Sequence, residues 1–322
     1  MTAASSPAPG DTLGSVGEQG VLARIFPRLP AAASTILGPG DDAAVIAAPD
    51  GRVVITTDMM VHGPDFRLAW STAADLGWKA AATNLADVAA MGAVPTALVV
   101  ALAAPAETLV TFLEEFADGL REGCEALAPG CGVVGGDLSV SDTLTIAVTA
   151  FGDLEGREPV LRSGARAGDI VAVSGRLGAA AEGLRLLFAL GPPDAAAAAR
   201  LKLEHPAQVA AQLRPHPPIA DGKAAAMAGA TAMLDLSDGL AIDARRLAAA
   251  SGVALDLSGV TPAELAGGED HSLLATFPSG TVLPGGFRPI GVVVEGDGVL
   301  VDGLPVTGGG WDPYSGWDGT RG

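Results

Sequence analysis

Gly38-Pro39-Gly40-Asp41-Asp42-Ala43-Ala44-Val45 is followed closely by Val53-Val54-Ile55-Thr56-Thr57-Asp58. Each segment places acidic residues beside an apolar run of the length expected for a short strand. Other carboxylates also adjoin apolar segments. Oxygen ligands of this kind suit Mg²⁺, which in phosphate sites uses a few carboxylates together with the phosphates themselves. The pattern predicts carboxylates that collect around divalent metal and a polyphosphate: Asp42, Asp58, Asp87, Asp137, Asp235 and Asp238.

Composition sets limits on the partners of the chain. Its 322 residues suggest one large or two medium domains, and 49% of them are hydrophobic. The net charge of −18 argues against a nucleic-acid backbone or an anionic membrane as partner. The lysines are few: Lys79, Lys202 and Lys223. A bound phosphate chain would therefore need metal ions as a source of positive charge.

The cysteines and the apolar segments indicate a cytoplasmic protein. Cys124 and Cys131 lack metal-site spacing, and no disulfide framework is indicated, so we expect a reducing cytoplasm. Residues 1–11 read as a frayed tail and not as a secretory signal. The uncharged run Val88–Ala106 is broken by glycine and proline, which favours a helix end, a turn and a buried strand over a membrane span.

The periodicity of apolar residues predicts two α/β halves. In the first half we expect helices at Gly17–Phe26, from Ser71 or Thr72 to Met91 and at Glu107–Leu127, and strands at Ala43–Ala47, Val53–Thr57, Thr96–Ala103, Cys131–Val134 and Leu144–Ala150. A polar boundary follows at 152–164. In the second half we expect strands at Asp169–Val173, Ala232–Leu236, Val253–Leu257, Ser272–Phe277 and Ile290–Glu295, and helices at Gly178–Leu190, Ala195–Ala199, Ile219–Met227 and Leu240–Ala250.

Common catalytic and phosphate-binding motifs are absent from the sequence. It has no Gly-x4-Gly-Lys-Ser/Thr loop, no dinucleotide glycine motif after a strand and no nucleophile elbow. Four histidines are scattered without metal-ligand spacing, which makes a zinc hydrolase improbable: His62, His205, His216 and His271. The carboxylate set remains. Any single aspartate is more often a turn former or a helix cap, but several that adjoin apolar runs favour a shared site.

Several other residues are candidates with competing explanations. Thr56 and Thr57 offer oxygen ligands or are ordinary strand residues. Arg162 meets a phosphate or is a solvated linker arginine. Ser237 and Asp238 precede a helix, and the competing explanation for Asp238 is that it simply caps this helix. Glu269 is an acidic candidate on a glycine-containing turn, and its competing explanation is an ordinary surface loop. Trp311 and Trp317 would stack on a cationic ring, and their competing explanation is that they cover the core.

Seven ordered motifs resemble those of thiamine-monophosphate kinases. They are Gly38–Val45, Thr56–Val61, Asn84–Ala93, Gly135–Asp137, Leu161–Ala165, Leu234–Leu240 and Gly267–Asp270, and the resemblance runs from about Val16 to Tyr314. The family belongs with aminoimidazole ribonucleotide synthetase and selenophosphate synthetase. It implies an α/β (α+β) fold of two domains: a mixed-sheet domain at 12–153 that binds ATP and metal and dimerises through its sheet, and an α/β sandwich at 154–322 whose tail contacts substrate.

The resemblance also implies roles for individual residues. Metal ligands would be Asp42, Thr56, Thr57, Asp58, Asp87, Asp137, Asp235 and Asp238. ATP would be bound by Gly136, Asp137, Arg162 and Ser237, and the acceptor by Asp65, Glu269 and Trp311. Two departures concern the acceptor site. Asp65 stands where the family commonly has histidine, and Trp311-Asp312-Pro313-Tyr314 is the nearest match to an aromatic-Asp-His-Phe ending, with Trp317-Asp318 as a second candidate.

The implied activity is ATP-dependent phosphorylation of thiamine monophosphate, the last step of thiamine diphosphate biosynthesis. Several Mg²⁺ ions would assist an in-line transfer in a cytoplasmic homodimer. No general base is expected, because the acceptor phosphate ionises near pKa ~6. The alternatives are another ATP-dependent synthetase of the superfamily, which activates an amide or amidine, and a non-enzymatic divalent-cation binder. Selenophosphate synthetases need a reactive cysteine near the start, and no cysteine precedes Cys124.

Overall fold

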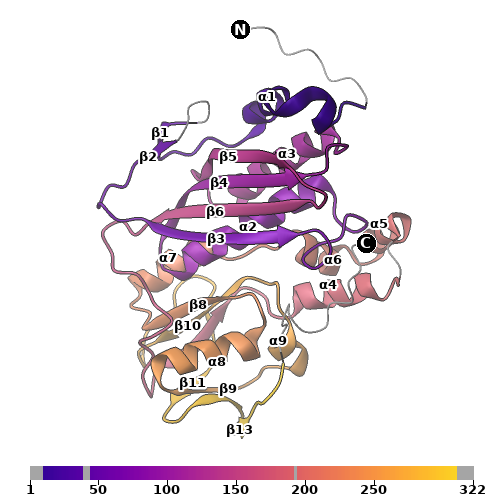
Figure 1. Ribbon diagram of the computed structural model, residues 1–322. Helices are drawn as coiled ribbons and strands as arrows, with labels where there is room; N and C mark the ends of the chain where they lie inside the picture. Colours follow the sequence, from indigo (N-terminus) through magenta and orange to yellow (C-terminus); the bar gives the residue numbers. More distant parts are fainter. Residues whose placement is uncertain (1–9, 39–43, 192–193, 310–322) are drawn as a thin grey trace.

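The computed structural model describes residues 10–38, 44–191 and 194–309. Asp42, Trp311 and Trp317 lie outside these residues. Three sheets organise the chain: one of four strands, one of seven and a small two-stranded pair. The four-stranded sheet lies above the seven-stranded one in Figure 1, with helices α2 and α3 behind the upper sheet and α8 in front of the lower one.

The first half of the chain forms the four-stranded sheet, in the order β3-β6-β4-β5. Strands β4 and β5 are parallel, and the other neighbours are antiparallel. The short strands β1 and β2 pair with each other. The elements are α1 (Leu13–Ile25), η1 (Phe26–Arg28), β1 (Thr35–Leu37), β2 (Val45–Ile46), β3 (Val54–Val61), α2 (Ala73–Ala90), β4 (Val94–Ala104), α3 (Val110–Leu127), β5 (Gly132–Val140) and β6 (Thr145–Asp153).

The second half forms the seven-stranded sheet, in the order β13-β12-β9-β11-β7-β10-β8. Its elements are β7 (Ile170–Ser174), α4 (Ala179–Phe188), α5 (Ala195–Glu204), α6 (Pro206–Leu213), α7 (Ile219–Met227), β8 (Ala232–Leu236), α8 (Leu240–Ser251), β9 (Ala254–Leu257), α9 (Pro262–Ala266), β10 (Ser272–Phe277), β11 (Arg288–Val294), β12 (Gly298–Val301) and β13 (Leu304–Pro305). The predicted domain limit at 153/154 falls between the last strand of one sheet and the first strand of the other, and it stays a prediction.

Helix α2 is the structural centre of the first half. The Thr72 side chain accepts from the backbone N–H of Asp75, and the Asp75 carboxylate accepts from the N–H of Thr72, so a capping box fixes where the helix begins. Most of α2 is buried between the four-stranded sheet, α3 and the second half. Half of the buried residues of α2 are alanine or glycine, and such small residues allow neighbouring backbones to approach closely.

Gly119 on α3 is one point of this close approach. A Cβ atom there would collide with the backbone carbonyl of Ala74 on α2. We therefore expect Gly119→Ala to lower the free energy of unfolding by about 2 to 3 kcal/mol, since two helix backbones would have to separate. Urea denaturation measures the change. Gly308→Ala, whose Cβ would meet nothing within 4 Å, is the matched control. Equal stability of both variants would contradict this account of the helix packing.

Both faces of the seven-stranded sheet are covered where it meets the first half. Strands β8 and β10 are buried along their whole length. On one face the core includes Leu240 and Leu247 of α8. On the other it includes Ala225 of α7 and Ala90, at the end of α2. Helix α2 therefore packs against both halves and contacts both β3 and β8 (Figure 1). We call this boundary between the two halves, where α2, β3 and β8 meet, the seam.

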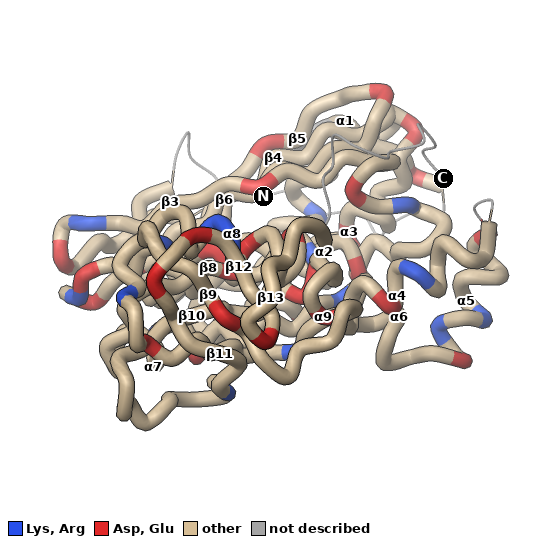
Figure 2. The backbone as a smooth tube through the Cα atoms, turned by 90° about the horizontal axis from the view of Figure 1, so that it is seen from below, with Lys and Arg blue, Asp and Glu red and all other residues tan. Residues whose placement is uncertain are grey.

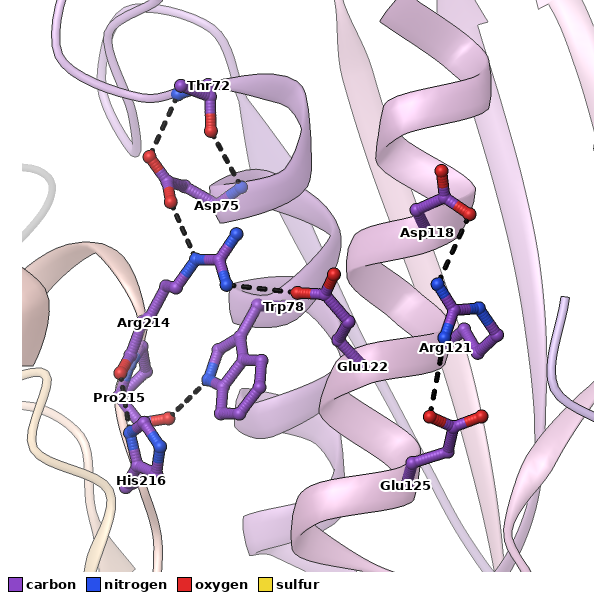
Figure 3. A network of polar contacts seen from close by, with 10 residues as sticks. All are labelled: Thr72, Asp75, Trp78, Asp118, Arg121, Glu122, Glu125, Arg214, Pro215 and His216. Carbon is purple, nitrogen blue, oxygen red and sulfur yellow. Dashed lines mark hydrogen bonds and ion pairs between the residues drawn. The ribbon is translucent and has the colours of Figure 1, made fainter. Parts of the chain in front are cut away.

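A polar network attaches the segment after α6 to helices α2 and α3 (Figure 3). The Arg214 guanidinium donates from Nε to Asp75 Oδ1 at 2.7 Å and from Nη1 to Glu122 Oε2 at 3.1 Å. Trp78 Nε1 donates to the Pro215 carbonyl at 2.8 Å. These contacts hold the end of α6 against α2 and α3.

Most of the predicted elements are confirmed, including the helix expected to start at Ser71 or Thr72, which Thr72 caps, but two strands run further than predicted. Strand β3 continues to Val61, so Asp58 lies within it and does not end it. Strand β5 continues to Val140 and contains Gly135-Gly136-Asp137, which the pattern predicted as a glycine turn. The β4–β5 register shifts there, and a Cβ on Gly136 would collide with the Val100 carbonyl, so the glycines fit an irregular strand.

Other elements were not predicted, and the alanine helix was predicted too short. The structure adds α6, α9, β1, β12 and β13, and it extends the predicted alanine helix to Glu204.

Among the described residues, no helix has both the length and the apolar character needed to cross a membrane. Asp and Glu positions are distributed over both halves, with Lys and Arg positions among them (Figure 2).

Candidate active site

Strand β3 presents two predicted site residues to helix α2. Thr56 and Asp58 alternate with residues of the opposite face. The Thr56 hydroxyl donates to Asp87 Oδ2 at 2.9 Å. The backbone N–H of Asp58 donates to Asn84 Oδ1 at 3.2 Å. Asn84 and Asp87, three residues apart on α2, therefore both face the strand, as the helical spacing predicts.

The seven-stranded sheet adds a third carboxylate from β8. Asp235 is buried, and its Oδ2 lies 3.3 Å from Nδ1 of the buried His271. His271 and Glu269 precede β10 with φ values of 50° and 68°, a conformation that non-glycine residues rarely adopt. The backbone N–H groups of Glu269 and His271 donate to carbonyls of Ser237 and Leu236 at 2.8 and 3.0 Å, which anchors the segment beside Asp235.

These carboxylates lie close enough to affect one another's ionisation. Desolvation, followed by the charges of Asp235 and Asp58, raises the pKa of Asp87 to about 7. Desolvation also raises the pKa of Asp58, with the charges of Asp235 and Glu269 adding to it and that of His271 opposing it. Burial by itself would lower the pKa of His271, but Asp235 and Glu269 raise it. Asp58, Asp87 and Asp235, here called the acidic group, therefore concentrate negative charge at the seam, and a bound cation would reduce the repulsion among them.

A cavity of about 410 Å³ has Glu269 in its wall, and Glu269 is close enough to the acidic group for its charge to act on Asp58. One part of its wall is charged and polar, with Asp65, Lys79, Gln212 and Glu269. Another part is aromatic and apolar, with Phe66, Trp70, Leu184, Phe188 and Leu213. Trp70 and Phe188 meet edge to face with ring centroids 5.1 Å apart, and the Arg67 guanidinium lies over both rings. The size and the mixed lining suit a small organic molecule that carries charge.

Lys79 and Glu269 form an ion pair in the cavity wall. Desolvation acts to raise the pKa of Glu269, but the charges of Lys79 and His271 outweigh it and lower that pKa. Desolvation raises the pKa of Asp65, with the charge of Glu269 adding to the shift and that of Lys79 opposing it. Two of the three residues predicted to contact the acceptor, Asp65 and Glu269, therefore share one cavity.

Asp137 lies away from the other carboxylates within a single chain. It pairs with Ala101, which pairs with Ala147, which pairs with Met59 of β3. Paired residues on neighbouring strands point to the same face, so Asp137 and Met59 share the face opposite Asp58. Thr57 is on that face too, and its hydroxyl donates to the Val148 carbonyl at 3.0 Å. One chain alone does not bring Asp137 or Thr57 to the acidic group.

The remaining predicted residues have varied surroundings. Arg162 is exposed on the segment between the two sheets, where its carbonyl accepts from the Ser251 hydroxyl at 3.1 Å. Ser237 and Asp238 directly follow β8 beside Asp235 and are half-buried. The Asp238 carboxylate accepts from Arg246 at 2.6 Å, a contact that a metal ligand would have to exchange or share.

Comparison with known proteins identifies the family. The model for "AIR synthase related protein, N-terminal domain" matches residues 40–154. A thiamine-monophosphate kinase of Mycobacterium tuberculosis is 45% identical over 95% of this chain and 92% of its own length. The chain belongs to the thiamine-monophosphate kinase family.

Solved structures in the family have the same fold. The thiamine-monophosphate kinase of Stenotrophomonas maltophilia matches with a TM-score of 0.75 at 31% identity, over 89% of this chain and 96% of that one. "AaThiL complexed with AMPPCP and TMP" matches with a TM-score of 0.71 at 32% identity, over 94% and 99%. The predicted two-domain α/β fold of this thiamine-monophosphate kinase family member is thereby confirmed.

The residues at the seam fit magnesium in the manner of a nucleotide site. Within the described ranges, no group of three or more His, Cys, Asp or Glu side chains is gathered closely enough to hold a metal ion unaided. Mg²⁺ in phosphate sites takes one or two carboxylates and completes its shell with phosphate oxygens and water. Asp58, Asp87 and Asp235 supply such carboxylates, and the pKa of Asp87 is raised because desolvation and the charges of Asp235 and Asp58 outweigh the opposing charge of His271.

Sequence reasoning missed three residues of the candidate site. The histidines were predicted to be scattered without a site role, but His271 pairs with Asp235. Lys79 was counted only as one of few lysines, and Gln212 was not considered. The position of His271 directly after Glu269-Asp270 was an available signal. Lys79 and Gln212 gave no local signal, because their partners come from distant parts of the chain.

Proposed function

We propose that this protein transfers the γ-phosphoryl group of ATP to the phosphate of thiamine monophosphate, which yields thiamine diphosphate and ADP. The observation that carries the proposal is the cavity of about 410 Å³ whose wall includes Glu269, a residue close enough for its charge to act on Asp58 at the seam. The family relatives are named for this reaction, and one related structure is described as complexed with AMPPCP and TMP. A cationic ring suits a cavity with Glu269 in its wall and aromatic side chains nearby.

The residue roles in this proposal follow the motifs. Mg²⁺ would be held by Asp42, Thr56, Thr57, Asp58, Asp87, Asp137, Asp235 and Asp238. ATP would be contacted by Gly136, Asp137, Arg162 and Ser237, and thiamine monophosphate by Asp65, Glu269 and Trp311. Thr56, Asp58, Asp87 and Asp235 lie near one another in the fold, which supports their roles, whereas Asp42 and Trp311 lie outside the described residues.

The chain's own groups position the reactants and do not exchange protons with them. The acceptor phosphate has its second ionisation near pKa ~6, so its oxygen is largely deprotonated at neutral pH and needs no general base. The cavity holds the ring, and the acidic group at the seam binds the cations that accompany the nucleotide. Magnesium would offset the charge of the two phosphate groups and hold them in line. His271 fixes the Asp235 carboxylate through its Nδ1 contact.

We further propose a homodimer that forms through the open face of the four-stranded sheet. Helices α2 and α3 cover the other face, whereas Ile55 and Met59 are 59% and 61% exposed on this one. Exposed apolar side chains gathered on a sheet face favour burial against a partner. A second copy would also bring its own Asp137 and Thr57 to the interface, since both lie on the open face.

Met59→Lys tests the dimer. The ammonium group would be buried without a partner at the interface, so we expect the dimer to dissociate by at least about tenfold in its dissociation constant. Size-exclusion chromatography with light scattering measures the mass. The matched control is Val282→Lys, at an apolar side chain that is 91% exposed elsewhere. A monomeric wild type, or a dimer that survives Met59→Lys unchanged, would remove this proposal.

Product analysis tests the function. The purified protein is incubated with ATP, magnesium and thiamine monophosphate, and the products are separated by chromatography. Thiamine diphosphate and ADP in equal amounts are expected. Release of inorganic phosphate without thiamine diphosphate would favour an amide- or amidine-activating synthetase of the same superfamily. No turnover of ATP with any acceptor would favour a divalent-cation binder.

A further inference from the structure

Lys79 places an ammonium group in the wall of the cavity, with its side chain only 6% exposed. It pairs with the carboxylate of Glu269. With the Gln212 amide oriented to satisfy both of its ends, Gln212 Oε1 accepts from Lys79 Nζ at 3.2 Å and its nitrogen donates to the Ala180 carbonyl at 3.0 Å. Groups from α2, from α6 and from the segment before β10 therefore meet at this ammonium.

The Lys79–Glu269 pair stands between the cavity and the acidic group. Lys79 precedes Asp87 by eight residues on α2, so the two residues share a helix face about 12 Å apart. Glu269 lies in the cavity wall, and its charge nevertheless helps to raise the pKa of Asp58. An acceptor with its ring in the cavity and its phosphate directed at the acidic group must pass this ion pair.

The pair creates a problem for a ligand that carries only a positive charge. Glu269 is already neutralised by Lys79, so a cationic ring that takes over Glu269 leaves the buried ammonium without its carboxylate partner and with only the neutral amide oxygen of Gln212 in hydrogen-bond contact among the partners described above. An unpaired buried charge is costly. A ligand that brings a phosphate group as well supplies a new partner for the ammonium, and both charges remain paired.

We propose that the Lys79–Glu269 pair is a specificity determinant that admits acceptors with both a cationic ring and a phosphate. On binding, Glu269 turns to the ring and Lys79 turns to the acceptor's phosphate. The inference rests on the proposed function and adds to it the basis on which the site distinguishes thiamine monophosphate from thiamine. Thiamine has the same ring and no phosphate, so it opens the pair without replacing the lost partner of Lys79.

Equilibrium binding of the two ligands tests the exchange. Calorimetry with magnesium and without nucleotide gives the dissociation constants of thiamine monophosphate and thiamine, and their ratio is the readout. Lys79→Met is expected to weaken thiamine monophosphate by about ten- to hundredfold and to leave thiamine unchanged or bound more tightly. Glu269→Gln is expected to shift the preference in the opposite direction, because it removes the partner of the ring and leaves Lys79 for the phosphate.

Two further variants separate this role from a structural one. Lys79→Arg keeps the charge and should retain most of the preference for the phosphorylated ligand. Lys202→Met removes a lysine that pairs with Asp75 at 2.9 Å outside the cavity lining, and it should not change the ratio.

Parallel weakening of both ligands in Lys79→Met and Glu269→Gln would assign the pair a purely structural role and overturn the proposal. If Lys79→Met does not fold, the direction of the Glu269→Gln shift decides alone. The proposed function has a separate test. If the wild type makes thiamine diphosphate but the ratio of the two dissociation constants does not change in the variants, only this inference is refuted. If the wild type makes no thiamine diphosphate, the proposed function is refuted.

Discussion

Asp87→Asn is expected to lower the rate of thiamine diphosphate formation by at least about hundredfold while it stabilises the metal-free protein. The loss of activity follows from removing a carboxylate at the centre of the acidic group, where Thr56 donates to it at 2.9 Å. The amide oxygen of the variant can still accept that hydroxyl, so the fold keeps this hydrogen bond. A residue whose replacement stabilises the protein and abolishes its activity is one retained for function.

The gain in stability has a defined pH dependence. Folding raises the pKa of Asp87 from 3.8 to about 7, so the folded chain holds this proton more strongly than the unfolded chain does. The stability that the protonated group contributes is present below pH ~4 and is lost as the pH rises through about 7. At pH 8 the wild type carries the full penalty, and we expect the variant to be more stable by about 1 to 3 kcal/mol. At pH 4 the two should be nearly equal.

Urea denaturation in the presence of a chelator, at pH 4 and at pH 8, measures both differences. Added magnesium should stabilise the wild type at pH 8 by binding the folded form, and it should stabilise the variant less. A variant that is no more stable than the wild type at pH 8 would show that Asp87 is not under electrostatic strain. A variant with normal turnover would remove Asp87 from the site.

Mixing two inactive variants is expected to restore activity if each site is built from two copies of the chain. Asp87 lies on α2 and faces β3 at the seam, whereas Asp137 lies on the open face of the sheet, so one chain does not bring them together. In a dimer, Asp87→Asn and Asp137→Asn would then damage a site from opposite sides of the interface. After subunits exchange at equal ratio, half of the dimers are mixed, and each mixed dimer has one intact site. Recovery of about a quarter of wild-type activity follows.

The measurement is the rate of thiamine diphosphate formation before and after exchange, with each variant alone as the control. An inactive Asp137→Asn that never complements Asp87→Asn would place both residues in the site of one chain, against the described geometry. An Asp137→Asn variant with unchanged turnover would remove Asp137 from the mechanism altogether.

Local sequence rules predicted those parts of the fold that local interactions decide. The capping residue Thr72 and the helical spacing of Asn84 and Asp87 led directly to α2 and to the face that meets β3. Long apolar periodicity likewise located α3. The acidic residues that adjoin apolar runs proved to include three that meet at one seam, although their metal and nucleotide roles stay predictions.

Features that depend on distant partners could not be predicted in this way. Gly135-Gly136 resembles a turn, and only the β4–β5 register shift and the close Val100 carbonyl explain why a strand continues through it. His271 contacts a carboxylate from another strand, and its left-handed backbone has no local motif. Lys79 and Glu269 are 190 positions apart, so their pairing follows from how the two halves pack.

The central claim is that the cavity and the acidic group form one site for phosphoryl transfer. The most direct test is a crystal structure of the protein with magnesium, a non-hydrolysable ATP analogue and thiamine monophosphate. We predict the ring beside Glu269, metal ions on Asp58, Asp87 and Asp235, and an acceptor oxygen about 3 to 3.5 Å from the γ-phosphorus. A ring bound outside this cavity, or metal ions that avoid those three carboxylates, would contradict the account.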